Sequence, residues 1–192
     1  SGMKAGRLFE VEKGPQGEVE EVLDGSRRVL RFAQPLEPFF DQAGHTPLPP
    51  YIRNYVGDPE RYQTVYNRAP GSAAAPTAGL HFTPELLARA QAKGCRLARV
   101  ELRVGLDTFA PVVEENAEDH HIHREWCQLD ESAAEMIRQT KREGGRVIAV
   151  GTTTVRTLES ACQKSNGQQV QAFCGETGLF ITPGYAFRCV DA

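Results

Sequence analysis

The amino-acid sequence predicts a layered domain of the α/β class, with an α+β arrangement as the alternative. From residue 84 onward, helical and extended patterns alternate along the chain, which is typical of domains that stack helices on a sheet. Residues 98–107 alternate apolar and charged side chains, the pattern of a strand with one buried and one exposed face. Residues 7–32 hold further β-type runs, too few to bury a core of their own.

Composition excludes several classes of protein. The chain has 192 residues, 40% hydrophobic and 24% charged, as in a globular protein of one domain or one domain with part of another. Its net charge of −3 lacks the basic excess usual in dedicated nucleic-acid-binding proteins. The cysteines show no C-x-x-C spacing, which favours reduced thiols and a cytoplasmic protein over disulfides or structural zinc. No apolar run approaches the about 20 residues that span a membrane.

The first third of the chain predicts short strands followed by a connector. Within residues 7–32, the runs "RLFEVE", "VEEVL" and "RRVLRF" are separated by turn sequences, so we expect three strands. Residues 33–60 are rich in proline, which removes a backbone donor and disfavours helix at the preceding residue. We therefore expect a connector with one helical turn near Leu36–Gln42.

Three helices are expected in the remainder. Thr83 and Pro84 are a good N-cap and a good first helical residue, and Gly94 should end that helix. Residues 130–143 are amphipathic and residues 152–164 form a third helical pattern.

Further apolar runs predict strands at 146–150, 178–182 and 185–190, whereas the polar segment 114–126 predicts a loop.

The segment "RVIAVGTTTVRTLES" is the first candidate site. An apolar strand runs into Gly151, then into three threonines that open a helix. A helix N-terminus presents free backbone N–H groups to an anion or a polar ligand. The alternative is that one threonine only caps the helix. Arg156 and Glu159, one turn apart, are expected to form a surface pair.

The segment "DHHIHRE" is the second candidate, because it contains four possible metal ligands, His120, His121, His123 and Glu125. A loop histidine that bonds to a ligand or to backbone is the alternative that we favour, and histidine exchanges protons near neutral pH.

Two more segments leave both interpretations open. The charged face of strand 98–107 is either solvated or, if covered, makes Glu101 or Asp107 a perturbed carboxylate. The small residues of "GSAAAPTAGLHFTPELL" (71–87) let backbone approach either a ligand or another backbone segment.

Six motifs together resemble the S-adenosylmethionine:tRNA ribosyltransferase-isomerases of the queuosine pathway. In chain order they are "HTPLPPYI", "ERYQTVYNRAPGSAAAPTAGLHFT", "VELRVGLDTFAPV", "EDHHIHREW", "GGRVIAVGTTTVRTLESA" and "GETGLFITPGYAFRCVDA". Family members are longer, so the resemblance implies an internal fragment. Residues 4–45 would be a remnant of an inserted small β-barrel with its connector, and residues 46–192 a partial α/β catalytic domain.

The resemblance also implies a reaction. The ribosyl moiety of S-adenosylmethionine is transferred to 7-aminomethyl-7-deazaguanine at the tRNA wobble position and isomerised, which gives epoxyqueuosine-tRNA and releases adenine and methionine. S-adenosylmethionine is then a co-substrate, tRNA the partner, and no prosthetic group, metal or membrane is implied; we expect a monomer. Two alternatives are a non-catalytic tRNA- or nucleotide-binding module and a histidine-dependent metal hydrolase, and the fragment itself is open to being inactive.

The family's motifs assign site residues by position. His81, His123 and Glu125 match as catalytic candidates, with His81 or Glu125 preferred as the general base that must remove a proton beside the sulfonium. His121 and Asp107 fall on variable positions and are set aside. The substrate-binding candidates are Thr77, Gly79, Phe82, Glu101, Thr108, His120, Gly151, Thr152, Thr153, Arg156 and Glu176.

Overall fold

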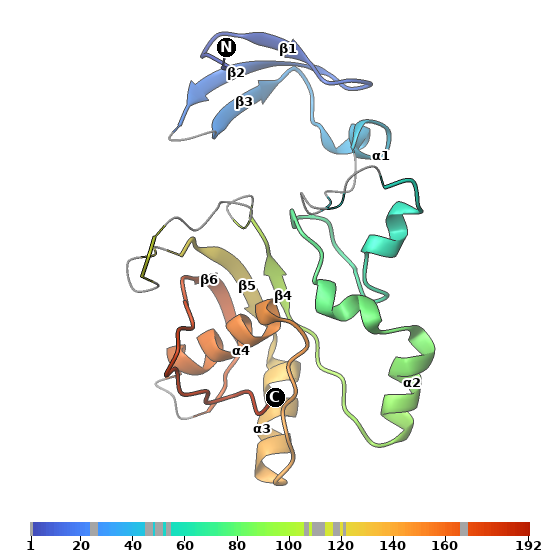
Figure 1. Ribbon diagram of the computed structural model, residues 1–192, viewed down its shortest axis with the longest axis vertical. Coiled ribbons are helices and arrows are strands. Elements are labelled where there is room, and N and C mark those ends of the chain that lie inside the picture. The colour runs from blue at the N-terminus through green and yellow to red at the C-terminus, as the bar shows by residue number, and fades with distance from the viewer. Residues whose placement is uncertain are drawn as a thin grey trace. The chain divides into compact units, whose positions relative to one another are not determined.

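The chain divides into two compact units, Ser1–Thr46 and Pro47–Ala192. The computed structural model describes residues 2–23, 27–44, 48, 52, 55–105, 108, 114–116, 120, 122–165 and 169–192, and Figure 1 labels the elements of each unit. The division lies next to the domain boundary expected from the sequence. The interpretation of the first unit as a barrel remnant stays a prediction.

The first unit is a three-stranded antiparallel sheet in the order β1-β2-β3. Its strands are β1 (Leu8–Glu10), β2 (Gln16–Val22) and β3 (Arg28–Phe32), at the three places predicted. Val19 is fully buried, and the rings of Phe9 and Phe32 meet edge to face at 5.7 Å. The helical turn predicted next is present as η1 (Glu37–Phe39) and α1 (Phe40–Ala43).

The second unit holds an antiparallel sheet in the order β4-β5-β6, with β4 (Glu101–Arg103), β5 (Glu125–Leu129) and β6 (Phe173–Thr177). The predicted mixture of helices and strands is confirmed, and the antiparallel pairing in both sheets is that of the α+β alternative. The loop predicted over 114–126 is wrong at its end, because β5 begins at Glu125. β6 was not predicted.

The strand predicted over 98–107 is too long: among its described residues only β4 pairs in a sheet. The reason lies in the segment before it. The Ser72 hydroxyl accepts from the Val104 N–H and donates to the Leu102 carbonyl, and the Ala73 N–H donates to the Val104 carbonyl at 2.8 Å. Backbone groups that would extend the ladder are therefore bonded to a loop.

Three predicted strands, 146–150, 178–182 and 185–190, are not strands. Val147 and Ala149 exchange backbone hydrogen bonds with Asp191 and Ala192 instead of joining a sheet. In the segment 185–190, successive N–H groups donate to a carboxylate on a helix. The apolar runs in this part of the chain therefore predict segments that are buried or line a cavity. They do not predict that a segment pairs with a neighbouring strand.

The predicted helices are confirmed. The helical elements are η2 (Pro59–Tyr62), η3 (Thr77–His81), α2 (Pro84–Ala92), α3 (Glu131–Arg142) and α4 (Thr152–Lys164). Thr83 caps α2 by accepting from the Leu86 N–H, and Gly94 follows it at φ +90°, where glycine is favoured. Among the described residues, no helix is long and apolar enough to cross a membrane.

The core of the second unit lies between the sheet and two helices. In Figure 1, α3 and α4 lie beside the β4-β5-β6 sheet, and α4 contacts all three strands. Its buried residues are Leu129, Ala133, Ala134, Ile137, Val147, Leu158, Ala161, Cys162, Val170 and Cys189. On β5, Glu125, Cys127 and Leu129 are buried on the face toward α4, so Trp126 and Gln128 point to the opposite face.

Candidate active site

Arg156 joins α4 to two strands of the sheet. Its Nη1 donates to Oε2 of Glu125 at 2.5 Å, and its Nη2 donates to the carbonyls of His123 at 2.7 Å and Thr177 at 3.2 Å. Glu125 opens β5 and Thr177 closes β6, so one guanidinium holds the start of one strand and the end of the next. We call His123, Glu125, Arg156 and Thr177 the Arg156 cluster.

Glu125 is a buried carboxylate, 6% exposed. Burial of a carboxylate costs free energy unless a cation and hydrogen-bond donors compensate for lost water. Arg156 supplies the cation, and the Gly105 N–H donates to Oε1 at 3.2 Å. The side chain is therefore held in one place.

Two atoms of the Arg156 cluster are buried without a hydrogen-bond partner. They are Nε2 of His123 and Nε of Arg156, and the described residues hold no other such side-chain atom. Nε2 of His123 lies 3.1 Å from Oε1 of Glu125, but the two atoms do not have the geometry of a hydrogen bond. Buried polar atoms without partners are rare in folded proteins and call for an explanation. The Arg156 cluster thus holds two polar atoms that its own hydrogen bonds leave unsatisfied.

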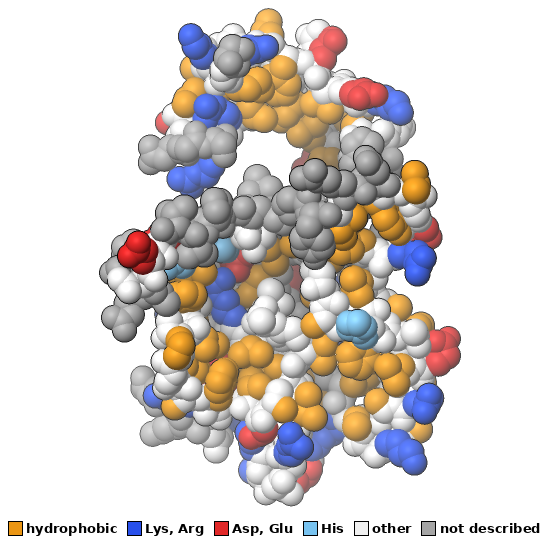
Figure 2. All heavy atoms as spheres, in the orientation of Figure 1, with side chains coloured by type: hydrophobic (Ala, Val, Ile, Leu, Met, Phe, Trp, Pro, Cys, Tyr) orange, Lys and Arg blue, Asp and Glu red, His pale blue; other side chains and the backbone are white. Residues whose placement is uncertain are grey.

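A mostly apolar cavity of about 560 Å³ shares Arg156 with the cluster. It is lined by Ile122, Thr152, Val155, Arg156, Leu179, Phe180, Ile181, Phe187, Val190, Asp191 and Ala192. Ligand pockets span about 300–1,000 Å³ and combine apolar walls with a few polar groups. Phe180 and Phe187 are 38% and 54% exposed, and hydrophobic side chains are exposed on the face of the second unit seen in Figure 2.

The first turn of α4 forms one wall of this cavity, through Thr152. The N-cap is Gly151 at φ +93°, and no side chain caps the helix. The alternative that one threonine is only the cap is therefore wrong; the Thr154 hydroxyl donates back to the Val150 carbonyl. A Cβ added to Gly151 would lie 3.7 Å from the Ala78 Cβ of η3, so the "PTAGLH" segment adjoins this turn.

His120 lies close to the cavity wall. Its Nδ1 is 3.0 Å from Oε2 of Glu114, and its ring centroid is 5.4 Å from that of Phe180. Thr153, next to Thr152 in the first turn of α4, is half-buried, and its carbonyl accepts from the Thr157 hydroxyl. The "HxxHxE" and "GTT" motifs therefore meet around one cavity.

Glu101 and Glu176 lie on the other face of the sheet. β-Sheet register pairs Trp126 with both Arg103 and Glu176, and Glu101 with Gln128, which places these side chains opposite to Glu125. The side chains of Glu101 and Glu176 are 43% and 63% exposed and pair with arginines. The solvated-face interpretation of this strand holds for Glu101. Both carboxylates therefore lie away from the Arg156 cluster. Substrate binding by either of them stays a prediction.

In the segment 71–87, the structure favours backbone packing at one position. Gly79 is buried, and a Cβ there would come within 1.9 Å of the Tyr66 hydroxyl. Thr77 and His81 are exposed and Phe82 is half-buried. None of the hydrogen bonds or ion pairs among the described residues joins His81 to the Arg156 cluster. Thr108 is exposed; its role and that of His81 stay predictions.

The expected surface pair of Arg156 and Glu159 is wrong. Glu159 is fully buried, and its carboxylate accepts from the Tyr185 hydroxyl and from three consecutive N–H groups, those of Arg188, Cys189 and Val190. Burial, with the nearby Glu159 charge, raises the pKa of Tyr185. The two residues lie on one helix but bond to different segments.

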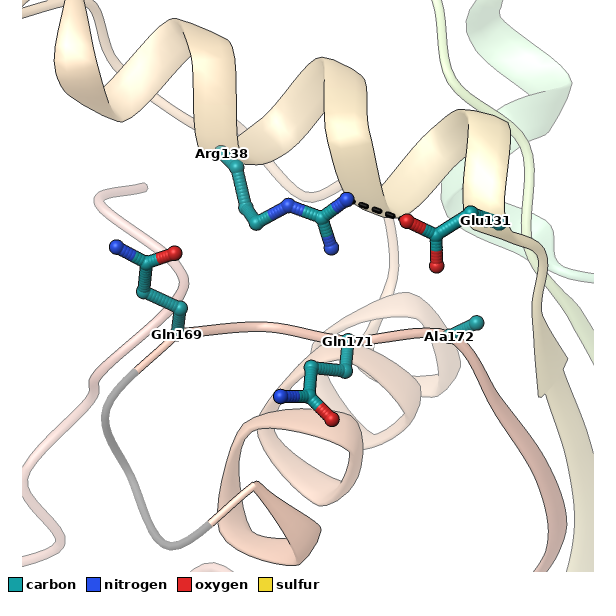
Figure 3. Close-up of a pocket in the computed structure, with 5 residues that line it drawn as sticks. All are labelled: Glu131, Arg138, Gln169, Gln171 and Ala172. Atoms are coloured by element: carbon teal, nitrogen blue, oxygen red, sulfur yellow. Dashed lines mark hydrogen bonds and ion pairs between the residues drawn. The ribbon is translucent and has the colours of Figure 1, made fainter.

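A second cavity, of about 400 Å³, lies between α3 and the segment 169–172. Figure 3 shows Arg138 reaching from α3 toward Glu131, with Gln169 and Gln171 opposite. Arg138 donates to Glu131, to Glu135 and to the Val170 carbonyl. No atom of Arg138 is buried without a partner among the described residues, so this cavity is the weaker candidate.

Metal binding gains no support from the described residues. They contain no group of three His, Cys, Asp or Glu side chains placed to hold a metal ion. His120 and His123 pair with different carboxylates. His121 and Asp107 lie outside the described residues.

Sequence reasoning missed the carbonyl of Thr177 and the N–H of Gly105, because backbone groups carry no side-chain signal. It also assigned Phe180 and Phe187 to strands, although both line the cavity. Their aromatic type, in segments rich in glycine and proline, was the available signal for a binding wall.

Comparison with known proteins identifies the family of this chain. The model of the family described as queuosine biosynthesis protein matches residues 1–192. An S-adenosylmethionine:tRNA ribosyltransferase-isomerase of Natranaerobius thermophilus is 50% identical over 98% of this chain and 55% of that protein. One of Acaryochloris marina is 51% identical over 88% of this chain and 46% of that protein. The chain spans about half the length of these relatives.

One solved structure is also similar, that of S-adenosylmethionine tRNA ribosyltransferase from Thermotoga maritima. It is 26% identical, with a TM-score of 0.45, over 98% of this chain and 49% of that chain. Because the family model covers every residue and two relatives share half of their aligned residues with it, this chain belongs to the queuosine biosynthesis protein family.

Proposed function

We propose that this chain carries a catalytic part of an S-adenosylmethionine:tRNA ribosyltransferase-isomerase. The reaction transfers and isomerises the ribosyl moiety of S-adenosylmethionine onto 7-aminomethyl-7-deazaguanine in the tRNA wobble position, and releases adenine and methionine. Family membership and the names of two relatives, 50% and 51% identical, support the proposal. The observation that carries it in the structure is the buried Arg156 cluster at the wall of an apolar cavity.

The chemistry of the sulfonium suits this site. A base removes a proton from C5′, and the electron pair of the C–H bond stays on carbon, where the adjacent sulfonium stabilises it. A soft sulfonium cation is favoured near aromatic faces and carboxylates. Phe180 and Phe187 line the cavity and supply the aromatic faces, and Arg156, which also lines it, is bonded to the carboxylate of Glu125.

His123 is the proton carrier that the geometry favours within the Arg156 cluster. Its Nε2 makes no hydrogen bond among the described residues and lies 3.1 Å from Oε1 of Glu125, whereas both oxygens of Glu125 accept hydrogen bonds from other groups. Glu125 and Arg156 then act as positioning residues for the histidine. His81, exposed on η3 beside the α4 turn, is the other candidate.

The proposal includes a cytoplasmic enzyme that acts as a monomer on tRNA, with S-adenosylmethionine as co-substrate and no prosthetic group. All five cysteines are free, which agrees with a reducing compartment.

Adenine release tests the function. The polypeptide encoded by the complete reading frame is incubated with S-adenosylmethionine and with tRNA that carries 7-aminomethyl-7-deazaguanine, and adenine is measured by chromatography. Adenine should form in proportion to modified tRNA, and not with tRNA that keeps guanine at the wobble position. No adenine with the modified tRNA would contradict the proposal.

The same experiment addresses the alternatives. A binding module would retain tRNA without releasing adenine. A metal hydrolase would lose its activity with a chelator, an outcome that the separate pairing of His120 and His123 argues against.

A further inference from the structure

We propose that Ser160 and Thr177 are positioning residues, whose hydroxyl groups hold one wall of the 560 Å³ cavity in a fixed place relative to Arg156. Neither residue is among those that line the cavity, so both act through their neighbours. The proposal rests on the proposed function, because it concerns where the groups that serve the reaction are held.

The two hydroxyl groups form a buried pair between a helix and a strand. Ser160 lies on α4 and Thr177 ends β6, and each residue is 4% exposed. Their hydroxyl oxygens lie 2.5 Å apart. A hydroxyl buried to this extent depends on protein groups for its hydrogen bonds, and leaving it unpaired costs free energy. The pair therefore ties α4 to the end of β6.

The neighbours of this pair determine which hydroxyl donates. Each hydroxyl has one proton. That of Ser160 goes to the Arg156 carbonyl at 2.6 Å, so Ser160 accepts within the pair and Thr177 donates. The Thr177 oxygen in turn accepts from the Leu179 N–H at 3.1 Å. Three hydrogen bonds thus run in one direction from Leu179 to Arg156, and bonds in such a chain strengthen one another. We call this chain the hydroxyl relay.

Both ends of the hydroxyl relay lie at the cavity. Leu179 lines it within the segment 179–181, and Arg156 lines it from α4. A second connection runs in the opposite direction, from Nη2 of Arg156 to the Thr177 carbonyl at 3.2 Å. The two connections close a ring between α4 and the end of β6. The segment 179–181 therefore cannot move away from Arg156 without breaking buried hydrogen bonds.

Loss of the hydroxyl relay should impair the reaction by misplacing groups that it does not itself contain. Arg156 also donates to Glu125 and to the His123 carbonyl, so a shift of Arg156 moves the proposed proton carrier as well. A displacement of about 1 Å in a catalytic site can cost about 100-fold in rate. Because the relay fixes geometry, its loss should lower kcat.

Substitutions that nearly preserve side-chain shape test the relay in the polypeptide encoded by the complete reading frame. Thr177→Val replaces the hydroxyl by a methyl group, whereas Thr177→Ser keeps the hydroxyl. At saturating concentrations of S-adenosylmethionine and of tRNA that carries 7-aminomethyl-7-deazaguanine, kcat for adenine release should fall about tenfold in Thr177→Val. Thr177→Ser should recover most of this loss and lie within about threefold of the wild type.

A double-variant cycle tests whether the two hydroxyls act as one unit. Ser160→Ala alone should also lower kcat about tenfold. The double variant Ser160→Ala/Thr177→Val should lose little more than either single variant, because one substitution already interrupts the relay.

Thr157→Val is the matched control. Thr157 is fully buried on α4, and its hydroxyl donates to the Thr153 carbonyl within the same helix. This variant loses a buried hydroxyl without interrupting the relay. In urea denaturation its stability should fall about as far as that of Thr177→Val, whereas its kcat should stay within about twofold of the wild type.

Amide hydrogen exchange gives a readout that does not depend on activity. In Thr177→Val the Leu179 N–H loses its acceptor, so its exchange should become at least about tenfold faster, and it should stay unchanged in Thr157→Val.

Unchanged exchange at Leu179 in Thr177→Val would overturn the relay. So would an unchanged kcat in that variant, an equal loss of kcat in Thr157→Val, or a double variant whose loss is the product of the two single losses. Each of these results leaves the proposed function standing if the wild type releases adenine. The expected exchange pattern in a wild type that releases no adenine would refute the proposed function, and with it the role of the relay in the reaction.

Discussion

Glu159 is a buried carboxylate that organises a whole segment through one side chain. Its oxygens accept from the Tyr185 hydroxyl and from the N–H groups of residues 188–190, at distances from 2.9 to 3.3 Å. A carboxylate surrounded by donors is satisfied without a cation. Because Phe187 and Val190 lie in this segment and line the cavity, Glu159 fixes one cavity wall to α4.

Removal of the Glu159 carboxylate should therefore destabilise the second unit. Glu159→Ala leaves several buried donors without an acceptor, so the free energy of unfolding should fall by about 2–4 kcal/mol in urea denaturation. Amide hydrogen exchange at residues 188–190 should become faster. As a control, Glu143→Ala removes a carboxylate whose side chain is 52% exposed and should cost no more than about 1 kcal/mol. Equal losses in the two variants would contradict this role.

At the scale of elements, α3 shows how local chemistry sets a boundary. Asp130 precedes the helix, and its carboxylate accepts from the Ala133 N–H at 2.7 Å and from the Ser132 hydroxyl at 2.8 Å. These hydrogen bonds, with that of Ala133 foremost, lower the pKa of Asp130 below its ordinary 3.8. The ionised cap therefore stabilises the folded state above that pH, and its contribution is lost as the pH falls through the lowered folded pKa.

Asp130→Ala should lower the free energy of unfolding at pH 7 by about 1 kcal/mol, because α3 loses its N-cap. Urea denaturation of the wild type and the variant between pH 7 and pH 2 would measure the difference, which should shrink as the pH falls below 3.8. Asp130→Asn keeps a capping oxygen without the charge and should lose less at neutral pH. A difference that stays constant with pH would show that ionisation of Asp130 is irrelevant to the cap.

The same scale explains which site residues could be found from the sequence. Helix limits depend on neighbouring residues, so capping by Thr83 was readable from the sequence. β5 was not, because its buried face begins with Glu125 and holds only two apolar residues, Cys127 and Leu129. Arg156, brought from α4, and the N–H of Gly105 make Glu125 compatible with burial. The register of β5 then placed the catalytic candidate Glu125 on one face of the sheet and the substrate-binding candidates Glu101 and Glu176 on the other.

At the scale of the molecule, burial divides the cysteines into two classes. Cys127, Cys162 and Cys189 are buried, whereas Cys95 and Cys174 are exposed. Burial raises the pKa of each buried thiol, that of Cys189 to about 12. The thiolate is the reactive form, so the fold protects three thiols from modification.

A thiol reagent such as Ellman's reagent should therefore label two cysteines of the native chain rapidly at pH 8, and all five after denaturation in guanidinium chloride. Cys95→Ser and Cys174→Ser should each remove one rapid equivalent. Rapid labelling of a third thiol in the native chain would show that the core around α4 opens.

Residue patterns alone determined the mixed helix–strand class, the positions of α2, α3 and α4, the strands of the first unit and the family's motifs. Each depends on contacts between residues close in sequence. The tertiary structure decided that the "HxxHxE" and "GTTxxRTLE" motifs share one buried cluster, that the apolar runs after residue 145 are not strands, and that Glu159 binds backbone. These outcomes depend on partners distant along the chain, whose hydrogen bonds and burial no local pattern encodes.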